Sequence, residues 1–130
     1  MTDKPPPIKA RELLGGEAIS FDEDSGVGKV RYVADEGLMN PAGTVLGGYL
    51  SAMLDDVAGL TTWFAGGKRM FTTAQMSTSF IRGAKLGEPL IGESTLTGHG
   101  KRQAFVEATL SRESDGKVVA KATLVQTFLD

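Results

Sequence analysis

The stretch that most constrains the fold is residues 40–66, which reads NPAGTVLGGYLSAMLDDVAGLTTWFAG. It holds the only long helical pattern in the chain, because its apolar residues recur at the 3.6-residue period of an α-helix. We expect the helix to begin near residues 44–48 and to end by residues 66–67, where glycines stop it. The apolar stripe consists of Leu46, Leu50, Met53, Leu54, Val57 and Phe64.

Most of the remaining chain has the composition of β-strands. Residues 17–22 and 27–35 predict a hairpin around the turn Asp24-Ser25-Gly26. Runs rich in Thr, Val, Phe and Leu predict four strands after the helix, followed in order as an antiparallel meander. These runs lie at about residues 70–81, 90–99, 102–112 and 118–129. The sequence therefore predicts an α+β domain in which one long central helix packs on an antiparallel sheet.

Length and composition exclude several classes of protein. The 130 residues suit one domain, which we expect over 17–130, after an N-terminal tail and short helix over 1–16. A net charge of −2 gives no general attraction to nucleic acid or to anionic membranes. The absence of cysteine excludes disulfides, thiol catalysis and Cys-ligated metals. No apolar run reaches the ~18 residues of a membrane span, and the N-terminus lacks the apolar core of a secretory signal, so we expect a cytoplasmic protein.

The helix carries two features that suit chemistry. Gly47 and Gly48 lie where a loop enters the helix, so their N–H groups could hold an anion or polarise a carbonyl oxygen, although the pair also suits tight packing against the sheet. Asp55 shares its side of the helix with small and hydroxyl side chains, whereas we expect Asp56 on a solvated face. Gly47 and Asp55 lie ~12 Å apart along the axis. They could act on one atom only if a symmetric dimer supplied Asp55 from the partner.

The other candidates carry weaker signals. The single histidine, His99, lies in a Gly-rich turn and is expected at the surface. No cluster has metal-ligand spacing, so no metal is expected, and no Ser-His-Asp nucleophile set can be assembled. Basic residues at turns between the long strands suit either a phosphate-binding rim or ordinary solubilising charge. These residues are Arg82, Lys85, Lys101 and Arg102.

The segment NPAGTVLGGYLSAMLDD resembles the signature of hotdog-fold acyl-CoA thioesterases of the phenylacetate-pathway-like (PaaI-type) subgroup. The segment TTAQMSTSFIRGAKLGEPL extends the resemblance, which covers roughly residues 17–129. It implies a hotdog fold, in which an antiparallel sheet wraps a long helix and the chains pair into a homodimer and often a homotetramer. It also implies an acyl-CoA substrate, with CoA entering as part of the substrate and no other cofactor.

The resemblance assigns roles to individual residues. Asn40 matches the residue that positions the thioester or the attacking water, and Gly47 matches the glycine whose N–H polarises the carbonyl. Asp55 matches the general base or nucleophile, and Thr73 matches the hydroxyl that holds the water. In the family each site lies between two subunits, which implies Asn40 and Gly47 from one chain and Asp55 and Thr73 from the other.

One position departs from the family pattern. Leu46 stands where the family has a histidine before Gly-Gly. We expect Leu46 and Gly48 to contact the substrate. We expect the four basic residues to contact the phosphates of CoA. The leading hypothesis is hydrolysis of an acyl-CoA thioester. Leu46 favours the alternative of a non-catalytic acyl-CoA or acyl-group binding protein. A hotdog hydratase would need a histidine in or before the helix, and none is present there.

Overall fold

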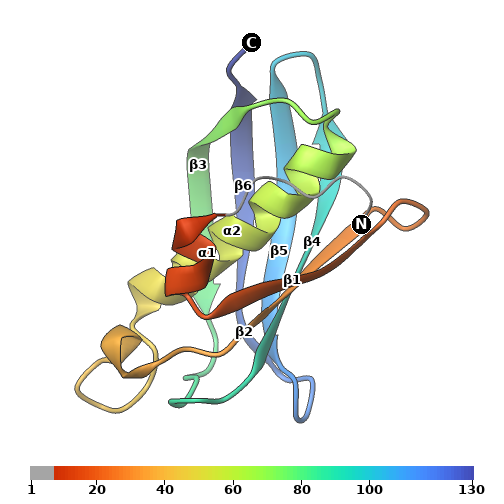
Figure 1. Cartoon of the computed structure of the whole chain (residues 1–130). Coiled ribbons are helices and arrows are strands. Elements are labelled where there is room, and N and C mark those ends of the chain that lie inside the picture. Colours follow the sequence, from red (N-terminus) through yellow and green to blue (C-terminus); the bar gives the residue numbers. More distant parts are fainter. Residues whose placement is uncertain (1–7) are drawn as a thin grey trace.

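Helix α2, Gly47–Ala65, lies across one face of a six-stranded antiparallel sheet (Figure 1). The computed structural model describes residues 8–130. The predicted α+β architecture of one long helix packed on an antiparallel sheet is confirmed. The other elements are α1 Lys9–Leu13, β1 Gly16–Asp22, β2 Val27–Tyr32, η1 Glu36–Leu38, β3 Phe71–Phe80, β4 Leu90–His99, β5 Gln103–Arg112 and β6 Val118–Phe128.

Most helix and strand boundaries lie close to the glycines and turn residues that predicted them. Helix α2 begins at the first glycine of the Gly-Gly pair and ends before Gly66. Strand β2 ends at Tyr32 rather than at residue 35, because the Asp35 carboxylate accepts a hydrogen bond from the Gly37 N–H and starts the short helix η1. Of the tail and short helix predicted over residues 1–16, residues 1–7 lie outside the described residues, and α1 corresponds to the short helix.

The order of the strands corrects one prediction. The sheet runs β1-β2-β4-β5-β6-β3, so the four strands after the helix do not form a single meander. Helix α2 carries the chain across the sheet, and β3 then pairs with β6 at the far edge, with Phe71 opposite Phe128 and Phe80 opposite Ala120. Strand β2 takes the place beside β4, with Tyr32 opposite Leu90. This order leaves β1 and β3 as the two edges of the sheet.

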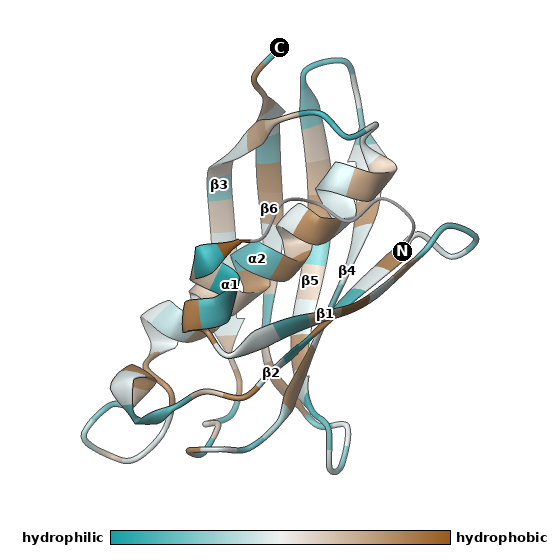
Figure 2. Ribbon diagram, viewed as in Figure 1, coloured by the Kyte–Doolittle hydropathy of each residue, from teal (hydrophilic) through white to brown (hydrophobic). Residues whose placement is uncertain are grey.

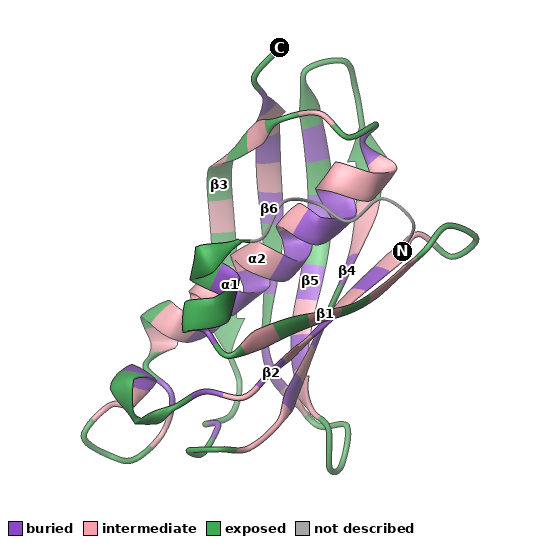
Figure 3. Ribbon diagram, in the orientation of Figure 1, coloured by how far each residue is buried: buried purple, intermediate pink, exposed green. Residues whose placement is uncertain are grey.

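The core lies between α2 and the inward face of the sheet. Hydropathy alternates along β5 and β6 (Figure 2), and the alternate residues that face α2 are buried (Figure 3). The apolar stripe on α2 is confirmed in its central part, but Leu46 is 47% exposed because it precedes the first helical turn. Phe64 is half-buried and stacks on Phe21. The buried apolar residues of α2 are Leu50, Met53, Leu54, Val57, Ala58 and Leu60.

No helix among residues 8–130 is both long enough and apolar enough to cross a membrane.

A glycine on β2 sets how closely the helix approaches the sheet. A methyl group at Gly28 would lie 2.3 Å from the hydroxyl oxygen of Thr61 and 3.4 Å from Leu60 on α2. We expect Gly28→Ala to lower the free energy of unfolding by about 1–3 kcal/mol, because the extra carbon forces the helix and strand apart. Urea unfolding measures this. The control is Gly100→Ala, where the added methyl group meets no atom within 4 Å and should cost less than about 0.5 kcal/mol. Equal losses in the two variants would contradict the packing argument.

Candidate active site

The candidate site is centred on a hydrogen bond between α2 and β3. The hydroxyl of Thr73 donates to Oδ1 of Asp55 at 2.6 Å, so two of the predicted site residues lie in contact within one chain. Thr73 stands at an irregularity in the pairing of β3 with β6, where the register shifts between Thr73 and Gln75. The flank of α2 that faces the edge strand therefore holds a carboxylate with a fixed hydroxyl beside it.

Two buried residues that the sequence analysis did not identify lie behind this pair. Gln126 on β6 donates from Nε2 to the Thr73 hydroxyl oxygen at 3.2 Å, and Thr62 on α2 donates to Oε1 of Gln126. Gln126 and Thr62 are both fully buried. The signal in the sequence is the alternation of β6, because Gln126 occupies the same inward phase as Ala122 and Leu124.

A pocket of about 550 Å³ opens beside Asp55 and Thr73. It lies between α1, the flank of α2 and the first residues of β3. Most of its wall is formed by apolar side chains. Asp55, Asp56 and Arg11 are the charged residues of its lining, and Asp56 is already paired with Arg11. An apolar hollow with the Asp55 carboxylate at its side suits an apolar group attached to a reactive polar centre. The apolar lining includes Leu14, Ala52, Leu60, Trp63, Met70 and Phe71.

Asp56 is buried, which corrects the prediction of a solvated side chain. Its Oδ2 accepts from Arg11 Nε at 2.8 Å and lies 2.6 Å from the Tyr32 hydroxyl. The Arg11 and Asp56 side chains are only 10% and 7% exposed. Burial, together with the Asp56 carboxylate, raises the pKa of Tyr32 well above its usual range, so the phenol keeps its proton for the hydrogen bond. This contact ties α1, which precedes the predicted domain boundary, to α2.

At the start of α2, the N–H groups of Gly47 and Gly48 point out of the first helical turn, where a helix has no acceptors of its own. The carbonyl of Leu46 accepts from the N–H groups of Tyr49 and Leu50, and Leu46 supplies no side-chain cap. In the part of the chain that the structure describes, no hydrogen-bond acceptor lies at the N–H of Gly47 or Gly48. Gly48 is exposed and has open space around it, so a carbonyl oxygen or an anion can approach this end of the helix dipole.

Asn40 uses its side chain within its own turn. The amide oxygen accepts from the N–H groups of Ala42 at 3.0 Å and Thr44 at 3.1 Å, and the amide nitrogen donates to the Thr44 hydroxyl at 2.9 Å. The loop before α2 is held further by the bond from the Val45 N–H to the carbonyl of Ala84. The Asn40 side chain therefore stabilises the turn in the loop that leads to Gly47.

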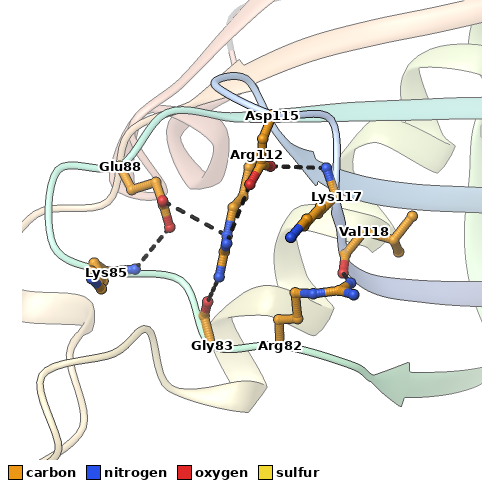
Figure 4. A network of polar contacts seen from close by, with 8 residues as sticks. All are labelled: Arg82, Gly83, Lys85, Glu88, Arg112, Asp115, Lys117 and Val118. Atoms are coloured by element: carbon orange, nitrogen blue, oxygen red, sulfur yellow. Dashed lines mark hydrogen bonds and ion pairs between the residues drawn. The ribbon is translucent and has the colours of Figure 1, made fainter.

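The four basic residues fall into two pairs at opposite ends of the sheet. Lys85 pairs with Thr44 in the loop before α2, and Arg82 donates to the carbonyl of Val118 at 2.6 Å, beside the Arg112 network (Figure 4). Lys101 and Arg102 lie in the β4–β5 turn, near the start of β3 and the end of β6 (Figure 1). One chain alone does not assemble a rim from all four.

His99 is exposed at the end of β4, and its ring lies edge-on to Phe128. Over residues 8–130 no group of His, Asp and Glu side chains has the arrangement to hold a metal ion.

The buried ion pair predicts a large effect on stability. Replacing Arg11 with Met leaves the Asp56 charge buried and uncompensated, so we expect the free energy of unfolding to fall by about 3–5 kcal/mol. Asp56→Asn in the Arg11→Met background should recover part of this loss. Arg31→Met, which breaks the exposed pair with Glu113, is the control and should cost less than about 1 kcal/mol. Similar losses for Arg11→Met and Arg31→Met in urea unfolding would contradict this interpretation.

The comparisons with known proteins agree with the fold. The thioesterase superfamily matches residues 42–119. A phenylacetic acid degradation-related protein of Ralstonia eutropha JMP134 is 34% identical, with a TM-score of 0.85 over 95% of this chain and 92% of that chain. A conserved protein of Pseudomonas aeruginosa is 29% identical, with a TM-score of 0.82 over 92% of each chain.

At lower identity the comparisons show the fold alone. The E. coli PaaI protein from the phenylacetic acid degradation operon is 18% identical, with a TM-score of 0.81 over 92% of this chain and 87% of that chain. A comparison with curated proteins gives no match. The family match covers more than half of the chain, and the chain therefore belongs to the thioesterase superfamily, with the hotdog fold of its PaaI-type members.

Proposed function

We propose that the protein hydrolyses an acyl-CoA thioester to a carboxylic acid and free CoA. The observation that carries this proposal is the hydrogen bond of Thr73 to Asp55 beside the apolar pocket. Two relatives with the same fold support a CoA ligand: a thioesterase protein of Streptococcus pneumoniae solved with coenzyme A, and a protein of Streptococcus mutans bound to acetyl CoA. They are 22% and 24% identical to this chain, with TM-scores of 0.79 and 0.76.

The chemistry divides between the first residue of α2, Gly47, and its middle, where Asp55 lies. The N–H of Gly47 polarises the thioester carbonyl and stabilises the negative charge that develops on its oxygen. Asp55 acts as general base for water or as the nucleophile, and Thr73 orients it. The two groups are separated by ~12 Å along one helix, so each site takes Gly47 from one chain and Asp55 from its partner.

Strand β3 offers the surface for this pairing. It is an edge of the sheet, and Met70 and Phe80 near its two ends are 66% and 55% exposed. Gly47 lies at the Phe80 end, since a methyl group there would be 3.5 Å from the Phe80 ring, whereas Thr73 lies at the opposite end. Antiparallel pairing of two β3 strands about a twofold axis brings Gly47 of one chain toward Thr73 of the other.

The same pairing accounts for the two separated pairs of basic residues. Arg82 and Lys85 of one chain lie at the Phe80 end of β3, and Lys101 and Arg102 lie at the Phe71 end. In the proposed dimer, Arg82 and Lys85 of one chain lie beside Lys101 and Arg102 of its partner. All four basic residues can then contact the phosphates of one CoA. Leu46 and Gly48 contact the thioester end of the substrate, and two such dimers can associate into a tetramer.

Leu46 supports a second candidate function, which is acyl-CoA binding without turnover. The exposed leucine at the N-cap of α2 supplies no polar contact where the family has a histidine. Wild-type protein that binds acyl-CoA and releases no thiol would favour this function.

The first test is Asp55→Asn, assayed by thiol release from short, aromatic and long acyl-CoAs. We expect kcat to fall by about 10²–10⁴-fold, because the amide cannot take a proton or attack the carbonyl. Asp24→Asn, in the exposed β1–β2 turn, is the matched control and should leave kcat unchanged. Equal activity of wild type and Asp55→Asn would rule out this acid as the base or nucleophile.

The second test removes only the proposed oxyanion donor. Gly47→Pro deletes the N–H at the first helical position, which tolerates proline, and Leu46 already has the extended backbone (ψ of 135°) that proline requires before it. We expect kcat to fall by about 10²–10³-fold, whereas Gly47→Ala keeps the N–H and most of the activity.

Mixing the two inactive variants tests the shared site. Unfolding and refolding Gly47→Pro together with Asp55→Asn should restore about a quarter of wild-type activity, since half the dimers are mixed and each holds one complete site. No recovery from mixed dimers would place the whole site within one chain.

A further inference from the structure

We propose that Gln126 is a positioning residue that sets the direction of the Thr73 hydroxyl toward Asp55, and that Thr62 in turn sets the orientation of Gln126. This inference rests on the proposed role of Asp55. It concerns two residues that lie behind the site, on β6 and on the buried face of α2, and that do not line the pocket.

The four side chains form one continuous line of hydrogen bonds. Thr62 donates to Oε1 of Gln126, Nε2 of Gln126 donates to Thr73 at 3.2 Å, and Thr73 donates to Asp55 at 2.6 Å. Gln126 is fully buried, so its amide has no bulk water with which to exchange these partners. A buried amide on the otherwise apolar inward face of β6 is costly unless both of its ends are hydrogen-bonded.

The direction of every bond follows from the carboxylate. An ionised Asp55 can only accept, so Thr73 must give its single proton to Asp55. The Thr73 oxygen then presents only lone pairs to Gln126, which must therefore turn its NH₂ group toward Thr73. This leaves Oε1 of Gln126 facing Thr62, whose hydroxyl has a proton to donate. The opposite amide orientation would place the Gln126 oxygen against the Thr73 oxygen without a proton between them.

The line of bonds gives the two carboxylate oxygens of Asp55 different environments. Oδ1 holds the Thr73 proton, whereas Oδ2 has no hydrogen-bond donor among residues 8–130. Oδ2 is therefore the oxygen that is left to receive a proton from water or to attack the carbonyl. Without Gln126, the Thr73 hydroxyl can rotate away and the carboxylate loses its fixed orientation, which lowers kcat more than it affects substrate binding.

The test compares kcat and KM for Gln126→Met and Thr62→Val with wild type, using the best substrate from the acyl-CoA panel. Each variant keeps the approximate size of the side chain, and circular dichroism and urea unfolding check that it folds. We expect kcat to fall about five- to tenfold in each variant, with KM changed less than twofold. Thr62→Ser keeps the hydroxyl, so its kcat should stay close to that of wild type. Gln103→Met, on an exposed residue of β5, is the matched control.

A double-mutant cycle separates positioning from a general structural role. Gln126 acts through Thr73, so Gln126→Met should have no further effect on kcat in a Thr73→Ala background. An equal loss in both backgrounds would overturn the inference, as would full kcat in Gln126→Met. In either of those outcomes Asp55→Asn remains inactive, and the proposed function stands. Wild type without thiol release, or with activity that survives Asp55→Asn, would overturn the proposed function and this inference with it.

Discussion

The packing of the apolar stripe of α2 onto the sheet is the constraint on which the other features depend. Leu50, Leu54 and Val57 are buried against the inward residues of the sheet, which fixes the rotation of the helix about its own axis. With that rotation fixed, Asp55 must project along the flank toward β3 and Asp56 toward α1 and Tyr32. The helix thus supplies the core with one face and the candidate site with another, and a shift in its packing would move both.

Two adjacent aspartates illustrate how packing separates roles that the sequence presents together. Asp56 is enclosed by Arg11 and Tyr32, so its charge is neutralised and it holds the first helix in place. Among residues 8–130, Asp55 has only the Thr73 hydroxyl as a hydrogen-bond partner, and it borders the apolar pocket, which leaves a carboxylate oxygen for chemistry. Opposite environments for neighbouring carboxyl groups are a common way in which proteins assign one acid to structure and the other to catalysis.

Strand β3 links the two halves of the proposed site. Its Phe80 end lies at the start of α2 with Gly47, and its other end carries Thr73 beside Asp55. An edge strand with exposed apolar residues is suited to pair with a second copy of itself, and antiparallel pairing would exchange these ends between subunits. The two pairs of basic residues lie at the same two ends, which is why a symmetric dimer can use them together although one chain cannot.

The sequence alone determined the elements and the chemical types at the site. The period of the α2 stripe, the glycines at its ends and the Thr-rich strands predict the helix and all six strands, since these signals are local in the chain. The resemblance named Asp55, Gly47, Asn40 and Thr73, and the structure places Thr73 on Asp55.

Tertiary structure decided which distant residues meet. Local patterns contain no information on pairing between segments that are distant in the sequence. The sequence therefore could not predict that β3 pairs with β6 at the edge of the sheet. Nor could it predict that Asp56 is buried against Arg11, 45 residues away. Gln126 was detectable as a polar residue in the inward phase of β6, but its partners were not. Contacts between segments depend on how the whole sheet closes over the helix, and that closure exists only in three dimensions.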